Sequence, residues 1–140
     1  MKHSTIQTVI WDFNGTILND IDLSTRAINA VLRRRGLPTI DTAQQRELFC
    51  FPVSAYYTSL GFDLNTEPHA DLSDEFHEGY LAGVGECGLN LGVRELLSDF
   101  EGRGIRQFVL SAAEQEMLTA WVDMLDLTNV FTGVYGLSDR

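Results

Sequence analysis

The segment 8–20, with the sequence TVIWDFNGTILND, constrains the fold of this 140-residue chain more than any other. It begins inside a β-rich run over residues 6–11, which is typical of a buried strand. The run ends at Asp12, and Asn14-Gly15 then turns the chain. A carboxylate at the end of an apolar strand indicates either a functional group at the edge of a sheet or a side chain that caps a turn.

The turn leaves both interpretations open. Asn-Gly is the strongest two-residue signal for a β-hairpin, in which Asp12 would only cap the turn. After the turn, however, the chain does not alternate as a returning strand would. Apolar residues at Ile21, Ile28 and Val31 follow a helical period instead. This pattern favours a strand followed by a helix from about residue 20 to residue 35.

Strands and helices alternate at the two ends of the chain, whereas the middle is helical throughout. Beyond the first strand, the hydrophobic periods predict these elements: a short helix capped by Asp41 and Gln44, a helix from Pro52 onward, and helices over 71–84, 93–103 and 112–127, with strands over 105–111 and 130–136. Such an order predicts an α/β fold with a parallel sheet, formed by residues 1–19 and 86–140. Residues 20–85 are then a small all-helical insert.

Two of the predicted strands end in polar residues, Asp12 and Ser111. Functional groups gather beyond the carboxyl ends of parallel strands, so these two are neighbours if their strands pair. Asp12 can act as a nucleophile, because carboxylates form covalent phosphoryl intermediates, and Ser111 can hydrogen-bond an anion. Backbone N–H groups at Phe13 and Asn14, and at the helix start after Ser111, would add positive dipole ends. The spacing of Ser111 and Glu114 also predicts a capping box, a role compatible with phosphate contact.

The overall charge restricts the partners. Ten Lys and Arg residues against twenty Asp and Glu residues give a formal charge of −10, which repels nucleic acid and anionic lipid. The sequence contains no apolar stretch of membrane-spanning length and no signal-peptide pattern at its start. Cys50 and Cys87 have neither metal-site nor disulfide spacing. We therefore expect a cytoplasmic protein with free thiols and with no nucleic-acid or membrane partner.

A single basic run, Arg33-Arg34-Arg35, precedes Gly36. Cations suit the last turn of a helix, and glycine suits the position that follows it, so the run is interpreted as a helix end. The alternative is a patch that recognises phosphate.

These residues carry a family resemblance. VIWDFNGTILND resembles the first motif of the haloacid dehalogenase-like hydrolases, in their phosphoglycolate phosphatase-like branch. QFVLSAA, which ends its strand at Ser111, resembles the second motif. The helical block over 20–85 stands where that branch inserts a small helical cap. The resemblance covers nearly the whole chain.

The resemblance implies a Rossmann-like core, Mg²⁺ as the cofactor and hydrolysis of a small phosphorylated metabolite. It implies that Asp12 is the nucleophile and a metal ligand, and that Asn14 occupies the position of the general acid/base and binds the metal through its carbonyl. Ser111 would hold the transferring phosphoryl group. Phe13, Gly15, Thr16, Ser111 and Ala112 would surround the phosphate.

Two departures from the family pattern matter. Asn14 replaces the usual second aspartate, and an amide does not give up a proton, so turnover of poor leaving groups should be slow. The third and fourth motifs, a Lys or Arg and an acidic pair, are absent, because the one lysine is Lys2 and the sequence ends at Arg140. We expect the chain to be the larger part of a longer protein with an incomplete core. A partner chain or swapped copy, such as a homodimer, and a short homologue without chemistry are the alternatives.

Three functions follow. The first is a magnesium-dependent phosphatase that acts through an aspartyl-phosphate. The second is a binding or regulatory domain that keeps the fold without turnover. The third is carbon–halogen hydrolysis, in which halide departs without a proton.

Overall fold

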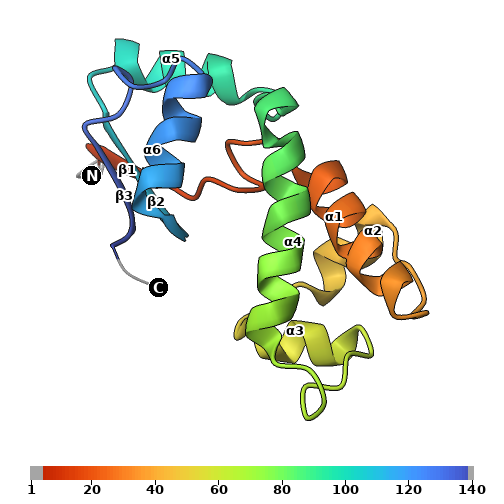
Figure 1. Cartoon of the computed structure of the whole chain (residues 1–140). Coiled ribbons are helices and arrows are strands. Elements are labelled where there is room, and N and C mark those ends of the chain that lie inside the picture. Colours follow the sequence, from red (N-terminus) through yellow and green to blue (C-terminus); the bar gives the residue numbers. More distant parts are fainter. Residues whose placement is uncertain (1–4, 139–140) are drawn as a thin grey trace. The chain divides into compact units, whose positions relative to one another are not determined.

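The computed structural model describes residues 5–138 and divides the chain into two compact units (Figure 1). One unit joins Met1–Asn19 to Cys87–Arg140, and the other is Asp20–Glu86. The first contains the sheet with two helices, and the second contains helices only. The predicted α/β class is confirmed.

The sheet of the α/β unit has three parallel strands in the order β1-β2-β3. The strands are β1 (Thr8–Trp11), β2 (Arg106–Glu114) and β3 (Gly133–Leu137). Helices α5 (Val93–Gly102) and α6 (Gln115–Met124) precede and follow β2. Parallel pairing excludes the hairpin interpretation of Asn14-Gly15, because β1 pairs with a strand about 100 residues away rather than with its own continuation.

One face of the sheet is buried. Val109 of β2 is fully buried, and Trp11 lies beside it in register. Gln107 is also buried in this layer, where its side chain accepts a hydrogen bond from the indole Nε1 of Trp11 (3.0 Å) and donates one to the carbonyl of Leu97 in α5 (3.0 Å). A buried amide with both partners satisfied fixes the position of α5 on the sheet without an unpaired polar group.

The opposite face is apolar and exposed among the described residues. Ile10, Leu110 and Tyr135 alternate with the buried positions of their strands and are 66%, 60% and 55% exposed. Phe108 lies between them, with its ring stacked on that of Tyr135 at 6.4 Å. An uncovered apolar face with an unpaired edge strand at β1 favours association with other chains.

Substitution of Leu110 by Lys should therefore reduce concentration-dependent self-association of the 140-residue chain, measured by light scattering. A charge on an exposed position should leave the melting temperature nearly unchanged. Leu91→Lys is the matched control, because Leu91 is fully exposed but lies outside the sheet. Equal effects of the two substitutions would show that the sheet face plays no special part.

The helical unit is built from four helices and a short turn of 3-10 helix. They are α1 (Ile21–Arg34), α2 (Thr42–Leu48), α3 (Val53–Ser59), α4 (His69–Gly83) and η1 (Val84–Glu86). The predicted capping box of α2 is confirmed: the Asp41 side chain accepts from the N–H of Gln44 (2.8 Å), and the Gln44 side chain accepts from the N–H of Asp41 (3.0 Å).

The core of this unit is a cluster of side chains from α1, α3, α4 and the segment that follows α3. Its buried members are Ile28, Val31, Leu32, Tyr56, Tyr57, Leu60, Phe62 and Leu72. Burial raises the pKa of the Tyr56 hydroxyl to about 12, although its hydrogen bond to Gln45 acts in the opposite direction. In α4, Leu72 and Tyr80 are buried, whereas Leu81 is 46% exposed.

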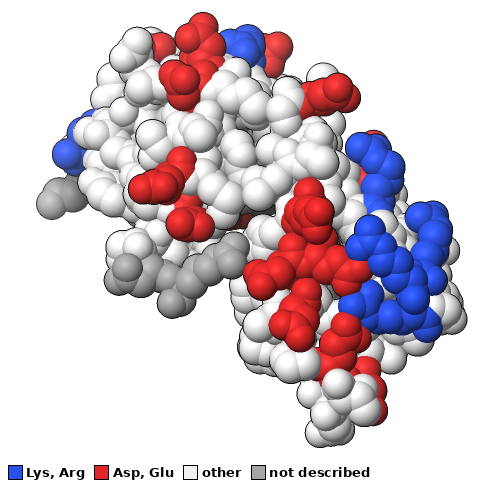
Figure 2. All heavy atoms as spheres, in the orientation of Figure 1, with Lys and Arg blue, Asp and Glu red and all other residues white. Residues whose placement is uncertain are grey.

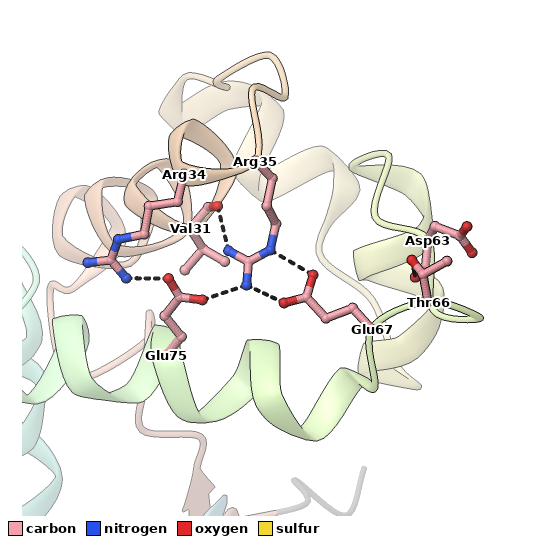
Figure 3. A network of polar contacts seen from close by, with 7 residues as sticks. All are labelled: Val31, Arg34, Arg35, Asp63, Thr66, Glu67 and Glu75. Atoms are coloured by element: carbon pink, nitrogen blue, oxygen red, sulfur yellow. Dashed lines mark hydrogen bonds and ion pairs between the residues drawn. The ribbon is translucent and has the colours of Figure 1, made fainter.

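Arg35, the last member of the basic run, lies in an ion-pair network rather than in solvent (Figure 3). Its guanidinium donates to both carboxylate oxygens of Glu67, to Oε2 of Glu75 (2.7 Å) and to the carbonyl of Val31 (2.9 Å). It also lies 5.7 Å from the centre of the Phe62 ring. Arg35 therefore ties the end of α1 to α4 and to the loop before α4.

The rest of the basic run follows the helix-end interpretation, which the structure confirms. Arg33 and Arg34 occupy the last turn of α1, and Gly36 has a positive φ of 65°. Arg34 pairs with Glu75. Figure 2 shows basic side chains gathered over the helical unit directly beside acidic ones. The Arg35 and Arg34 guanidinium groups are thus already partnered by carboxylates.

Replacement of Arg35 by Met should cost about 1–2 kcal/mol of unfolding free energy, because it leaves Glu67 without its cation and Glu75 with Arg34 alone. The hydrogen bonds from Arg35 lower the pKa of Glu67 and of Glu75 below the ordinary value of 4.5. Their contribution is therefore fully present above pH 4.5 and is lost as the pH falls through the lowered values. Urea unfolding at pH 7 and pH 3 measures this.

Arg33→Met is the matched control for that experiment, because Arg33 is exposed on the same turn. We expect it to change the unfolding free energy by less than about 0.5 kcal/mol at either pH. A loss in Arg35→Met that is the same at both pH values would contradict the ion-pair explanation.

Candidate active site

The site begins where β1 ends and a tight loop reverses the chain. The carbonyl of Phe13 accepts hydrogen bonds from the N–H groups of Thr16, Ile17 and Leu18, at 2.9 to 3.1 Å. Gly15 has a φ of 75°, a conformation that glycine adopts without cost. This loop is rigid because three donors share one carbonyl, and it fixes the residues around Asp12.

The two residues after β1 point in opposite directions, as in a strand. The Phe13 side chain is fully buried and stacks on Trp121 of α6, with ring centres 6.3 Å apart and planes within 8°. Asp12 is exposed, and its Oδ2 accepts a hydrogen bond from the Thr16 hydroxyl at 3.1 Å. Phe13 thus acts as the anchor that presents the Asp12 carboxylate to solvent.

The structure brings Ser111 to the same place. Parallel pairing sets Trp11, the last residue of β1, beside Val109, so Asp12 and Ser111 follow this pair at the same edge of the sheet. There the Ser111 hydroxyl donates to Oδ1 of Asn14 at 3.5 Å, across 97 positions of sequence. Asp12, Asn14, Thr16 and Ser111 therefore form one polar group at this edge, which we call the carboxyl-edge site.

The predicted capping box at Ser111 is wrong. β2 continues to Glu114, α6 begins only at Gln115, and no side chain caps this helix. The Ser111 oxygen instead accepts from the N–H of Ala113 at 3.0 Å. Consequently the N–H groups of the helix start lie beyond Ala112, which is part of the strand with an exposed side chain.

The strand is longer than predicted because the side chain of Gln115 binds it to β3. Oε1 of Gln115 accepts from the N–H of Gly136 (2.6 Å), and its Nε2 donates to the carbonyl of Val134 (3.0 Å). These bonds, with the pairing of Glu114 beside Leu137, hold the end of β2 against β3 across a register irregularity between Leu110 and Glu114.

Sequence reasoning missed Asn90. Its side-chain amide donates to the carbonyls of Thr16 (2.9 Å) and Leu18 (3.3 Å), and its backbone N–H donates to Ile17 (2.9 Å). It thereby holds the loop that carries the carboxyl-edge site. The one sequence signal for Asn90 was its place near Gly92, in a turn-like stretch before α5. Such a stretch predicts a turn but does not reveal a hydrogen-bond partner more than 70 positions away.

The donor atoms of the site suit a hard cation. Among residues 5–138, no three His, Cys, Asp or Glu side chains come together as a metal site. Asp12 nevertheless offers an exposed carboxylate, and Mg²⁺ in phosphate chemistry is held through one or two carboxylates together with water and the substrate's phosphate oxygens. The donor chemistry therefore fits magnesium through a single carboxylate.

The fold and site define an α/β protein with an exposed carboxylate on the loop after its first strand and with a helical unit inserted in the sequence after that loop. Residues 9–140 match the family model of the haloacid dehalogenase-like hydrolases. The chain belongs to this family, and the resemblance seen in the sequence is confirmed. No helix in the described part of the chain is both long and apolar enough to cross a membrane.

One curated protein resembles the chain in sequence, and solved structures resemble it in fold. The chain is 25% identical over 134 residues to a phosphoglycolate phosphatase of Caulobacter vibrioides, a match that covers 92% of this chain and 56% of the relative. A haloacid dehalogenase-like hydrolase from Streptococcus pneumoniae superposes with a TM-score of 0.82 at 16% identity, over 97% of this chain and 63% of that structure. CbbY from Rhodobacter sphaeroides, solved with phosphate, gives 0.68 at 20%, over 97% and 67%. The chain thus spans little more than half the length of its curated relative.

Proposed function

We propose that the protein is a phosphoglycolate phosphatase-like phosphatase of small phosphorylated metabolites, with Asp12 as its nucleophile. The observation that carries this proposal is the meeting of Asp12, Asn14 and Ser111 at one sheet edge. An exposed carboxylate on a rigid loop, beside a hydroxyl from the next strand, suits attack on phosphorus. The family membership and the phosphoglycolate phosphatase of Caulobacter vibrioides support the reaction class.

The reaction has two steps, transfer of the phosphoryl group to Asp12 and its hydrolysis. A carboxylate oxygen of Asp12 forms a bond to phosphorus, and the bond from phosphorus to the leaving oxygen breaks, with the electron pair staying on that oxygen. Water then cleaves the aspartyl-phosphate, which releases inorganic phosphate and restores the Asp12 carboxylate. In both steps the Ser111 hydroxyl would turn its one proton from Oδ1 of Asn14 to a phosphoryl oxygen.

Magnesium is part of the proposal. The Asp12 carboxylate and the backbone carbonyl of Asn14 would hold the ion, which supplies positive charge for the phosphoryl oxygens when it is bound. The Thr16 hydroxyl keeps Oδ2 of Asp12 in a fixed direction, so that one carboxylate oxygen is presented for attack.

Acetyl phosphate and magnesium test the first step directly. We expect mass spectrometry to find a phosphoryl group on the peptide that contains Asp12, and p-nitrophenyl phosphate to be hydrolysed. Asp123→Asn should change neither result, because Asp123 is an exposed carboxylate of the same unit, at the end of α6, that lies outside the carboxyl-edge site. Phosphorylation at any residue other than Asp12 would overturn the assignment.

A binding or regulatory role is the second candidate. It is favoured by the single carboxylate at the site and by the absence of a three-residue metal group among residues 5–138. Calorimetry that shows magnesium-dependent phosphate binding, together with no hydrolysis of an aryl phosphate, would select this role over catalysis.

A further inference from the structure

The loop after β1 is held by one residue that lies far away in the sequence, Asn90. Its side-chain amide donates hydrogen bonds to the carbonyls of Thr16 (2.9 Å) and Leu18 (3.3 Å). Its backbone N–H donates to the carbonyl of Ile17 (2.9 Å). Three successive carbonyls of the loop therefore share one partner residue.

The peptide groups of this loop are also held at their N–H ends. The N–H groups of Ile17 and Leu18 donate to the carbonyl of Phe13, at 2.9 and 3.0 Å. The carbonyl of Thr16 and the N–H of Ile17 belong to one rigid peptide plane, so that plane is bonded at both ends. The next plane is bonded in the same way. Neither plane can rotate without breaking a hydrogen bond to Asn90 or to Phe13.

Asn90 is itself anchored to a rigid part of the α/β unit. Its carbonyl accepts from the N–H of Val93, the first residue of α5, at 3.2 Å. Helix α5 is in turn tied to β2, because the side chain of Gln107 donates to the carbonyl of Leu97 at 3.0 Å. Asn90 therefore sets the position of the loop relative to β2, the strand that carries Ser111.

The effect of Asn90 reaches Asp12 through Thr16. The Thr16 hydroxyl donates to Oδ2 of Asp12 at 3.1 Å. Because this hydroxyl is carried on Cβ, its direction depends on the conformation of the Thr16 backbone. The amide of Asn90 holds the carbonyl of that same residue. Asn90 thus acts on the carboxylate through another residue.

We propose, on the basis of the phosphatase function above, that Asn90 is a positioning residue for the attacking carboxylate. It orients Thr16, and Thr16 turns one oxygen of Asp12 toward phosphorus. Reaction rates fall steeply when the attacking group is displaced from its productive position, even if its chemistry is intact.

Asn90→Ala should lower kcat for p-nitrophenyl phosphate by about 5-fold, the effect of one exposed hydrogen bond. KM should change by less than about 2-fold, because the residue acts on the nucleophile rather than on the substrate. The backbone bond from residue 90 to the carbonyl of Ile17 is kept in this variant, so the loop should stay folded. An unchanged kcat would overturn the proposal.

A double-mutant cycle with Thr16→Val tests whether Asn90 acts through the Thr16 hydroxyl. If it does, the double variant should lose no more kcat than the more impaired single variant, because the second change removes an effect that is already lost. Two losses that multiply would show independent contributions and would overturn the proposal.

Two control variants separate positioning from stability. Asn129→Ala removes an exposed amide after α6 and should change neither kcat nor the urea midpoint. Leu127→Ala truncates a side chain of the same unit that is only 2% exposed. It should lower the urea midpoint more than Asn90→Ala does, yet keep kcat under conditions in which the protein is folded. An equal loss of kcat in Leu127→Ala would show that the rate follows stability, and the positioning role would be wrong.

The outcomes also distinguish this proposal from the phosphatase function. If acetyl phosphate phosphorylates Asp12 and p-nitrophenyl phosphate is hydrolysed equally by the unmodified protein and by Asn90→Ala, the positioning role fails and the phosphatase function stands. If the unmodified protein is neither phosphorylated at Asp12 nor able to hydrolyse p-nitrophenyl phosphate, the phosphatase function fails and the positioning role fails with it.

Discussion

Asp12→Asn should lower kcat for p-nitrophenyl phosphate by about 10³-fold or more, because it removes the proposed nucleophile and with it the covalent route. The substitution keeps the size of the side chain and its exposed position. It also keeps an oxygen that can accept from the Thr16 hydroxyl, so the loop should retain its shape. Steady-state hydrolysis with magnesium measures the effect.

Thr16→Val separates positioning from chemistry. It removes the hydroxyl that holds Oδ2 of Asp12 but leaves the nucleophile in place. We expect a loss of about 10-fold or less, far below that of Asp12→Asn, since one exposed hydrogen bond contributes only about 1 kcal/mol. Asp12→Asn with undiminished turnover would show that another residue attacks phosphorus.

Phe13→Ala should cost about 3–5 kcal/mol of unfolding free energy, the largest stability loss that we predict. Phe13 is fully buried against Trp121, so truncation of its ring leaves a cavity in the core. Small domains are stable by only about 5–15 kcal/mol, so this change brings the α/β unit close to unfolding at room temperature. Urea titration followed by tryptophan fluorescence reports on it, because Trp11 and Trp121 both lie in this unit.

Leu91→Ala is the control for that truncation. Leu91 belongs to the same unit but is fully exposed, and its loss should change the unfolding free energy by less than about 0.5 kcal/mol. Because Phe13 also anchors the backbone beside Asp12, Phe13→Ala should lower catalysis even at temperatures where the unit remains folded. A variant that is destabilised but fully active would show that the site does not depend on this anchor.

The sequence predicted the fold well where local signals and tertiary packing agree. The helix ending in the basic run and the capping box of Asp41 with Gln44 are set by neighbouring residues, so they could be recognised from their spacing. The position of Ser111 beside the first strand followed from the rule that parallel strands end at a common edge.

The failures have a common cause in contacts that are distant in sequence. Ser111 and Glu114 have the spacing of a helix cap, but the side chain of Gln115 bonds to β3 and prolongs the strand. Asn90 could not be connected to the loop around Thr16, because nothing local distinguishes it from any asparagine in a turn. Arg35 likewise gave a helix-end signal but no sign of its two glutamate partners.

The segments that lead into and out of the helical unit run side by side. The N–H of Asn19 donates to the carbonyl of Gly88 at 2.8 Å, and Leu18 pairs with Leu89 in antiparallel fashion. The chain therefore leaves the α/β unit and returns to it through two adjacent segments. We therefore expect that replacing residues 20–86 by a short turn leaves the loop that carries Asp12 in place.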